Sequence, residues 1–317
     1  MDNRFLKVLV TGGAGFIGSH VVEQFLSKGH EVCVLDNFSS GKRQNLPTHG
    51  RLQIFGKDIL KDSLSDVPFQ PDVIVHMAAQ PSVVASWEQP YAAHQANLSA
   101  VMKMIEWRRV WKTPRIVWAS SAAVYGDPGV SVVDESVPAL PLSPYGFQKR
   151  SGELLLEMFA KHDGFDVVSL RMFNVFGPRQ DPASPYSGVI SLFVRRLISG
   201  EDLLIFGDGE QTRDFVYVED VARAFVAAAE SGVAGCHSVN IATGRARTVN
   251  ELAATLASLM PLWRGKIIHH ESRAGEILYS CADIARASKL LSYGPEVSFE
   301  AGLEKTFHYL HSGGLRS

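Results

Sequence analysis

Cysteine is scarce in the 317-residue sequence, and no apolar run approaches the length of a membrane span. The three cysteines, Cys33, Cys236 and Cys281, are far apart and form no Cys-x-x-Cys pair, which argues against a disulfide framework and a structural zinc site. We interpret all three as packing residues in a reducing compartment. A membrane-spanning helix needs about 20 apolar residues. The first residues also leave no room for the apolar region of a signal peptide. We therefore expect a cytoplasmic protein with no membrane partner.

The sequence also lacks an excess of either charge. Its formal net charge is -2, so it offers no broad cationic surface to nucleic acid, and local arginines must bind any anionic ligand. The neighbours His269 and His270 would point to opposite faces of a strand, so we expect no metal site. With 46% hydrophobic residues the chain can bury a large core, and its length is close to the limit at which one core becomes two domains.

Short apolar runs alternate with longer helical patterns through the first half of the chain. Ser143 and Pro144 are typical of the start of the last of these helices, because serine caps a helix and proline suits its first position. The alternation predicts an α/β fold, a Rossmann-like doubly wound parallel sheet. The expected strands cover residues 6–10, 31–35, 52–55, 73–76, 116–119 and 167–171, and the expected helices cover 16–27, 91–111 and 144–162.

The pattern changes after Arg171. Gly-Pro, Asp-Pro and Ser-Pro pairs mark a loop-rich stretch before a helix near residues 188–199, and residues 214–230 return to a strand followed by a helix. We therefore expect a smaller, interleaved C-terminal substrate domain. The first domain would comprise residues 1–175 plus 213–243, and the second would comprise residues 176–212 plus 244–317.

A glycine-rich turn follows the first expected strand. Gly12, Gly15 and Gly18 form a Gly-x-x-Gly-x-x-Gly pattern that opens a helix, and such a turn lets backbone N–H groups approach a pyrophosphate at the helix N-terminus. The second strand ends at Asp36, where a carboxylate would bind a ribose 2′-hydroxyl and repel a 2′-phosphate. These features predict NAD rather than NADP as the cofactor. The alternative is that Asp36 is an ordinary turn residue.

The ends of the next two strands extend this predicted cofactor site. Asp58 follows the third strand and offers a polar contact, whereas Ala78 and Ala79 follow the fourth and are small enough to let adenine and ribose come close. In the alternative interpretation Asp58 only caps a loop and the two alanines belong to the core.

Tyr145 and Lys149 lie four residues apart in the helix that begins after Ser143, so they share a helix face. A free tyrosine titrates at about 10. The ammonium, the helix dipole and a nearby nicotinamide would each favour the phenolate, which would make Tyr145 a usable base near neutral pH. The preceding strand ends in Ser120 and Ser121, which places hydroxyl groups at the same edge of the sheet.

These motifs in this order resemble the extended short-chain dehydrogenases/reductases, and closest among them the UDP-glucose and UDP-N-acetylglucosamine 4-epimerases. The resemblance covers nearly the whole chain and includes Ser-Ser-x-x-Val-Tyr-Gly from residue 120 and the segments 171–178 and 213–218. It implies that Tyr145 is the acid/base, that Lys149 is its electrostatic partner and a ribose ligand, and that Ser121 orients the substrate oxygen, with Ser120 as the alternative. Under this resemblance the first domain binds NAD and the second binds a nucleotide sugar.

The resemblance also implies which residues contact the ligands. Asn97 matches a position that supports the active site, although a locally satisfied helix residue is an alternative. The expected cofactor-binding residues are Gly12, Gly15, Phe16, Ile17, Gly18, Asp36, Asn37, Ser39, Gly41, Asp58, Ile59, Ala78, Ala79, Gln80, Asn97, Ser120, Tyr145, Lys149 and Phe173. The expected substrate-binding residues are Ser121, Ala122, Asn174, Gly188, Val189, Phe206, Arg213, Arg273 and Ser280.

Two alanines distinguish this chain from the related sugar-nucleotide dehydratases. Those enzymes carry an acidic pair just after the serine or threonine, and here Ala122 and Ala123 occupy those places. Methyl groups cannot move the proton that elimination requires. The resemblance then favours reversible oxidation at C4, in which Tyr145 removes the 4-hydroxyl proton, NAD accepts the hydride, and the keto sugar turns over before it is reduced again.

Such a reaction needs a firm hold on the nucleotide and a loose hold on the hexose. Arg213 and Arg273 match the family's diphosphate-binding arginines, whose forked donors suit phosphate. Asn174 and residues 187–190 match positions that line the diphosphate and uridine pocket. Surface ion pairs are the alternative for the two arginines.

Ser280 falls where related epimerases place a residue whose bulk limits a 2-acetamido group, and its small size favours UDP-GlcNAc and UDP-GalNAc, alongside or instead of UDP-Glc and UDP-Gal. The alternative is that Ser280 is small only for local packing.

The same residues are compatible with other functions. The chain could epimerise or reduce another nucleotide sugar such as a UDP-uronate, and less favoured alternatives are a dehydratase and a catalytically silent NAD-binding protein. The family resemblance further implies a homodimer joined through the helices at 91–111 and 144–162, although the apolar residues of these helices could instead be wholly internal.

Overall fold

A computed structural model describes residues 5–181, 188–272 and 277–314 of the chain. Its centre is a seven-stranded sheet in the order β10-β6-β5-β4-β1-β2-β3, and every neighbouring pair is parallel. All six predicted strands are confirmed within a few residues, and β10 is added at one edge. The strands are β1 (Lys7–Thr11), β2 (Glu31–Asp36), β3 (Leu52–Gly56), β4 (Val73–His76), β5 (Arg115–Ser121), β6 (Asp166–Met172) and β10 (Cys236–Ile241).

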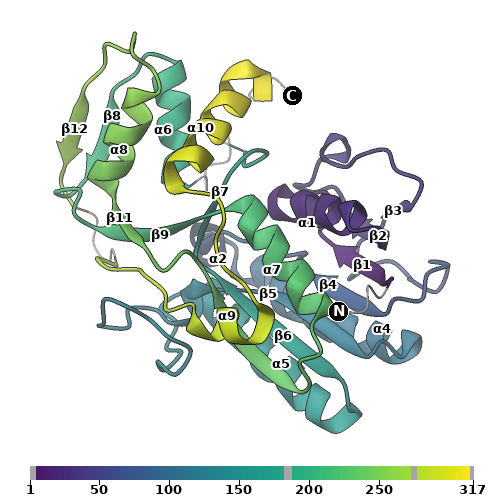
Figure 1. The fold of residues 1–317 in the computed structure, drawn as a ribbon. Helices are drawn as coiled ribbons and strands as arrows, with labels where there is room; N and C mark the ends of the chain where they lie inside the picture. The colour runs from purple at the N-terminus through teal and green to yellow at the C-terminus, as the bar shows by residue number, and fades with distance from the viewer. Residues whose placement is uncertain (1–4, 182–187, 273–276, 315–317) are drawn as a thin grey trace.

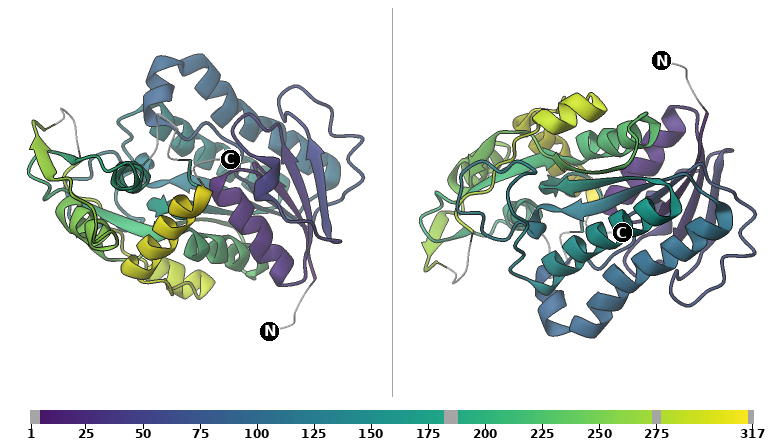
Figure 2. Two further views of the ribbon diagram at one scale, coloured as in Figure 1. Left: turned by 90° about the horizontal axis from the view of Figure 1, so that it is seen from above. Right: turned by 90° about the horizontal axis from the view of Figure 1, so that it is seen from below.

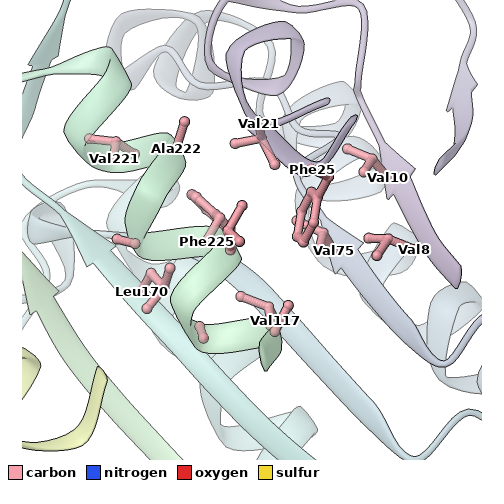
Figure 3. Packing of buried hydrophobic residues seen from close by; sticks show 14 of the residues in the cluster. Val8, Val10, Val21, Phe25, Val75, Val117, Leu170, Val221, Ala222 and Phe225 are labelled. Carbon is pink, nitrogen blue, oxygen red and sulfur yellow. The ribbon is translucent and has the colours of Figure 1, made fainter. Parts of the chain in front are cut away.

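Helices cover both faces of this sheet, as Figures 1 and 2 show. One face carries α1 (Phe16–Ser27), α7 (Val218–Glu230) and α9 (Ala285–Leu291), and the other carries α4 (Ala100–Trp111) and α5 (Pro144–Asp163). Successive strand residues point to opposite faces, and because helices cover both faces, these strands consist mainly of apolar residues. Figure 3 shows the first face, where side chains of β1, β4, β5 and β6 pack against Val21 and Phe25 of α1 and Ala222 and Phe225 of α7.

The strand order reverses between β1 and β4, because the chain builds outward from β1 in one direction and then returns to the other side. In doubly wound sheets ligands bind outside the carboxyl ends of the strands at such a point. Thr11, His76 and Ser121, the last residues of β1, β4 and β5, therefore lie at the expected binding edge.

The helix predicted at 91–111 is present over its whole length, but it is not one regular α-helix. It comprises α3 (Pro90–His94), a π-helical turn η2 (Gln95–Ser99) and α4, and it is preceded by the short helix α2 (Val83–Glu88). The prediction of a single α-helix was wrong because π turns have no strong sequence signature and often occur at functional sites. Here the turn carries the buried residue Asn97.

The rest of the chain forms a second, smaller set of elements with its own core, visible at the upper left of Figure 1. A three-stranded sheet pairs β9 (Thr212–Tyr217) with β7 (Asn174–Phe176) and β11 (Ala246–Thr248), and β8 (Leu203–Phe206) pairs with β12 (Ile267–His270). The helices α6 (Val189–Ile198), α8 (Val249–Ser258) and α10 (Phe299–Tyr309) pack beside them. Thus β9 belongs to this smaller part, whereas α7 packs against the large sheet and β10 is one of its strands. The exact division into two domains stays a prediction.

Two turns and one short helix complete the described elements. The turns η1 (Arg43–Asn45) and η3 (Ala122–Val124) flank the binding edge, and η4 (Leu310–Gly314) ends the described chain. Among the residues with described positions, no helix is long and apolar enough to cross a membrane.

Gly152 lies where α5 packs closely against the sheet. It is buried in the middle of the helix, and a β-carbon built at this position would overlap the indole ring of Trp118 on β5. Alanine normally stabilises a helix interior by about 1 kcal/mol relative to glycine, but overpacking a core costs about 1–3 kcal/mol. The absence of a side chain at residue 152 therefore lets α5 approach β5.

We predict that Gly152→Ala lowers the free energy of unfolding by about 1–2 kcal/mol in urea denaturation, in spite of its better helix propensity. Ser151→Ala, the neighbouring helix position, should leave stability almost unchanged. A second substitution, Trp118→Phe, removes the obstructing ring and should make the Gly152→Ala change less costly. Additive effects of the two substitutions would contradict this account.

Candidate active site

The glycine-rich turn joins β1 to α1 at the binding edge. Gly12 has a positive φ of 69°, and a β-carbon there would lie 2.8 Å from the backbone nitrogen of Ala78 after β4. The Thr11 hydroxyl accepts hydrogen bonds from the backbone N–H groups of Met77 (3.1 Å) and Ala78 (3.2 Å), which fixes the two strand ends together. Helix α1 starts after Gly15 without a side-chain cap. An uncapped helix N-terminus beside a turn without side chains fits a pyrophosphate.

Asp36 at the end of β2 supports this turn directly. One carboxylate oxygen accepts a hydrogen bond from the backbone N–H of Ala14 (2.9 Å), and the other accepts from that of Phe38 (2.8 Å). The side chain is buried, and Gly41 lies against it, where a β-carbon would be 3.0 Å from the carboxylate. Asp36 therefore shapes the turn, and the remaining lone pairs of the carboxylate suit a ribose hydroxyl.

The polar residues after β2 and β3, which are expected to bind the cofactor, contact each other. The Asn37 side chain donates a hydrogen bond to Asp58 (3.2 Å) and accepts one from the backbone of Ser39 (3.1 Å). Burial raises the pKa of the Asp58 carboxyl, but hydrogen bonds from Leu60, Asn37 and Lys61 outweigh it, so the pKa lies below its ordinary value. Ile59 instead packs into the core beneath them. An ionised carboxylate at this edge fits the adenosine part of NAD.

Asn97 links three separate segments. Its side chain accepts a hydrogen bond from the backbone N–H of Gln80 (2.7 Å), donates one to the Gln80 carbonyl (3.1 Å), and donates another to the side chain of Gln148 on α5 (2.7 Å). These partners are distant in sequence, so the alternative of a locally satisfied helix residue is wrong. The π turn thus holds the loop that follows Ala78 and Ala79 against the start of α5.

Tyr145 and Ser121 face each other at the centre of the edge. Tyr145 is buried in the first turn of α5, where its backbone N–H donates to the Ser86 hydroxyl (3.1 Å), and its own hydroxyl lies near enough to Ser121 for that side chain to lower the pKa of the phenol. The Ser121 hydroxyl also accepts from the backbone of Ala123 (3.2 Å). The Ser120 hydroxyl points to the other side of the strand and donates to Glu153 (2.6 Å). Of the two candidate serines, Ser121 is therefore the one beside the phenol.

Lys149 lies beneath this pair, as the four-residue spacing predicts. Its ammonium is 5.8 Å from the centre of the Tyr145 ring and 5.1 Å from that of Trp118, and it donates a hydrogen bond to the Ala119 carbonyl (2.7 Å). Burial lowers the pKa of Lys149 to about 7, although the Glu153 carboxylate opposes this shift. Near neutral pH the group is therefore close to its own midpoint.

The expected lowering of the Tyr145 pKa is not a property of the chain alone. Burial raises the pKa of the phenol above its ordinary value, and the hydrogen bond with Ser121 offsets only part of this effect. The prediction from charge did not include the loss of water around an enclosed phenol, and it still depends on the positive nicotinamide that would lie nearby.

Three buried polar residues near these groups were not predicted. His76 shares a hydrogen bond of 2.7 Å with the Thr11 hydroxyl, and burial lowers its pKa to about 3, helped by Lys149. Glu153 and Arg171 form a buried ion pair behind Ser120. The available signal was spacing, because Glu153 follows Lys149 by four residues and so continues the helix face that carries Tyr145.

The predicted substrate residues come from several separate segments. Ala122 and Phe173 belong to one apolar cluster with Ala282, so the segment that carries Ser280 packs beside the Ser121 end of β5. This segment also runs along β9, because Thr212 donates to the Leu278 carbonyl (2.8 Å) and Ala282 donates to Asp214 (3.3 Å).

The remaining predicted substrate residues with described positions lie on β7, β8 and β9 and at the start of α6. Arg213 is half-buried on β9 and donates to the Thr212 carbonyl (2.8 Å), and Asn174 is exposed at the start of β7. Gly188 precedes α6, which begins at the half-buried Val189 without a side-chain cap. Phe206 ends β8 with its ring 5.8 Å from that of His270. Arg273 lies outside the described residues.

Comparison with known proteins shows the family to which this chain is similar. Residues 8–242 match the NAD dependent epimerase/dehydratase family. A solved UDP-N-acetylglucosamine 4-epimerase from Methanobrevibacter ruminantium M1, in complex with UDP-N-acetylmuramic acid, is 38% identical with a TM-score of 0.92, over 98% of this chain and 99% of that one. The UDP-glucose 4-epimerase of Mycolicibacterium smegmatis is 34% identical over 97% of this chain and 99% of its own. The UDP-N-acetyl-alpha-D-glucosaminuronate decarboxylase of Bacillus cytotoxicus is 32% identical over 96% and 97%.

Proposed function

Because the chain belongs to the NAD dependent epimerase/dehydratase family, we propose that it interconverts the C4 epimers of a UDP-hexose with NAD as its cofactor. The observation that carries this proposal is the placement of Tyr145 beside Ser121 at the same sheet edge as the glycine-rich turn. An acid/base beside a dinucleotide site suits reversible oxidation of an alcohol.

Tyr145, Ser121 and Lys149 each have a distinct task in the proposed reaction. The Tyr145 oxygen takes the proton of the sugar 4-hydroxyl and later returns it, and the Ser121 hydroxyl orients the same sugar oxygen. Lys149 places a positive charge below the phenol and reaches the ribose of the cofactor. Bound NAD supplies the reversible oxidation at C4 and a positively charged ring, which adds to Lys149 in lowering the raised pKa of the enclosed phenol.

Two methyl groups support epimerisation over elimination. Ala122 and Ala123 form the turn η3 directly after Ser121, where a dehydratase needs an acid and a base. With no titratable group at these two positions, the 4-keto sugar keeps its hydroxyls and can only be reduced again.

The nucleotide half of the substrate needs most of the binding energy, because the hexose must turn between the two half-reactions. We assign the diphosphate to Arg213 and Arg273, with Asn174 and the uncapped N-terminus of α6 at Gly188 and Val189 beside it. Phe206 would line the uridine pocket.

The size of residue 280 bears on which UDP-hexose is the substrate. Ser280 is half-buried in the segment that packs beside β5, and its small side chain leaves room for a 2-acetamido group. We therefore propose that UDP-GlcNAc and UDP-GalNAc are substrates, alongside or in place of UDP-Glc and UDP-Gal. A UDP-uronate is the alternative, and the similarity to a uronate decarboxylase is the observation that favours it.

We also propose a homodimer. The outer surfaces of α2 to α5 expose Trp87, Tyr91, Met102, Phe147, Leu154 and Met158, although large apolar side chains on a stable surface are usually covered. Since α4 and α5 are neighbouring helices on one face of the sheet, two copies could bury these side chains in a helical bundle.

The reaction is tested by incubating the purified protein separately with UDP-GlcNAc, UDP-Glc and UDP-GlcA, with no NAD added, and identifying products by NMR. Interconversion of the first or second with its C4 epimer is expected.

We predict that Tyr145→Phe reduces turnover by about 100-fold or more, because general acid/base catalysis contributes at least that factor. Tyr309→Phe, on α10, should retain full activity. Undiminished turnover in the Tyr145 variant would contradict the mechanism.

Ser280→Tyr should separate the two sugar classes. The larger side chain is expected to lower kcat/KM for UDP-GlcNAc by about tenfold or more, with a much smaller effect on UDP-Glc. Parallel NMR rate measurements on both substrates check this. If activity on the acetamido sugar were unchanged, Ser280 would not limit the pocket.

Light scattering should give a mass of twice the chain's 34.7 kDa. Met158→Glu combined with Leu154→Glu should shift the protein toward the monomer, since each change buries a charge in the proposed interface. Leu262→Glu is the matched control, because Leu262 is 80% exposed and Met158 66%, but Leu262 lies beyond α8 in the smaller part of the molecule. A monomeric wild-type protein would disprove the dimer.

A further inference from the structure

A buried ion pair lies directly behind the proposed catalytic residues. Glu153 on α5 accepts two hydrogen bonds from the Arg171 guanidinium on β6 (2.8 and 2.7 Å), and both side chains are almost fully enclosed. Arg171 also donates to the Tyr125 hydroxyl (2.9 Å), which in turn donates to Asn240 on β10 (2.7 Å). The carboxylate is thus held from β6 and β10 as well as from its own helix.

Two side chains of α5 together hold the end of β5. Lys149 donates to the carbonyl of Ala119, and one helical turn later Glu153 accepts from the hydroxyl of Ser120 (2.6 Å). The next residue of the strand is Ser121, which faces Tyr145 of the same helix. The spacing between the Ser121 and Tyr145 oxygens therefore depends on where α5 holds residues 119 and 120.

Stability alone does not explain this ion pair. Burying two charges costs several kcal/mol per ion by general estimates, and well-packed apolar residues of similar size are often as stable or more so. The same positions could therefore be apolar without loss of the fold. The geometry, with the carboxylate joined to the catalytic strand end, offers a functional reason for the charge.

We propose that Glu153 is a positioning residue, which holds Ser121 opposite Tyr145 through Ser120 and favours the charged form of Lys149. This proposal rests on the function proposed above and adds a residue that touches neither the cofactor nor the sugar.

The groups around Lys149 support the second part of this role. Tyr145 and Glu153 lie on the same helix, His76 lies on β4 and stays neutral because burial lowers its pKa to about 3, and Arg171 and Arg150 are bound to Glu153 itself. Burial lowers the pKa of Lys149 to about 7, and Glu153 is the charge that opposes this shift. Lys149 is charged below its pKa and loses the charge as pH rises through it. Without the carboxylate, that loss occurs at a lower pH.

The test compares Glu153→Gln with Glu157→Gln, which removes the same charge one turn later on α5, where the side chain is partly exposed and is paired with Lys161 instead of Arg171. NAD affinity is measured by calorimetry between pH 5.5 and 9, because Lys149 is a proposed ribose ligand and this readout needs no sugar. In Glu153→Gln the loss of affinity with rising pH should move down by about one pH unit, and Glu157→Gln should follow the wild type. Coincident curves for all three proteins would overturn the electrostatic part.

Turnover provides the second readout. Glu153→Gln should lower kcat about tenfold or more with little change in KM, and its alkaline limb should move to lower pH. Ser120→Ala keeps every charge but removes the link to β5, so it should lower kcat while leaving the limb in place. Wild-type kcat in both folded variants would overturn the positioning part. An inactive wild type that binds NAD normally would instead disprove the proposed function, and the binding curves would still test Glu153.

Glu153→Gln leaves the Arg171 charge without its partner and could prevent folding. The double variant Glu153→Leu, Arg171→Met removes both charges and is expected to fold. Its NAD-binding curve should still move to lower pH, by less than in Glu153→Gln because no unpaired guanidinium repels Lys149. A wild-type curve in the folded double variant would overturn the proposal.

Discussion

The contact between the first turns of α5 and the end of β5 is the constraint on which the site depends. It encloses Tyr145 and Lys149 together, and enclosure acts oppositely on their pKa values, raising that of the phenol and lowering that of the ammonium. Both shifts favour uncharged groups, whereas the proposed chemistry needs a phenolate above an ammonium. The charge must therefore come from partners, and the structure has one on each side: Glu153 behind the lysine, and the cofactor edge in front of the phenol. Burial also excludes water, so each of these charges acts over a short distance in a medium of low polarity.

Much of this edge could be predicted from the sequence, because parallel strands bring the residues that follow them to one side. The glycine-rich turn, Asp36, Ser121 and the pair Tyr145 and Lys149 each follow a strand or open a helix, so their local signals placed them. Asn97 was indicated only by the family resemblance, and Glu153 only by its four-residue spacing from Lys149, and neither signal predicted the partners of these side chains. Asn97 depends on a π turn within a helix that looks regular, and Glu153 on a partner from β6 that only folding brings near. The raised pKa of Tyr145 was missed for a related reason, since burial is a property of the whole fold.

The proposed substrate residues, in contrast, come from several elements of the chain. The β9 strand, the loop after β10 and the segment around Ser280 meet at Asp214, whose buried carboxylate accepts hydrogen bonds from Thr243 (2.8 and 2.6 Å), Gly244 (2.9 Å) and Ala282 (3.3 Å). This single side chain ties together three stretches that are far apart in sequence. Arg213 and Ser280 are therefore held relative to one another by their neighbours. A rigid frame of this kind suits a ligand whose nucleotide stays still while its sugar turns.

The chain passes several times between the large sheet and the smaller set of elements. It leaves the large sheet after β6, returns with α7 and β10, leaves again for β11 and α8, and comes back once more with α9, which packs under the same sheet. Neither half of the molecule is a continuous piece of polypeptide, so no single cut could release either one intact. During synthesis on the ribosome, the large sheet would lack α9, which packs against it, until the residues of this helix have emerged. The large sheet and the smaller set of elements would therefore complete their folding together.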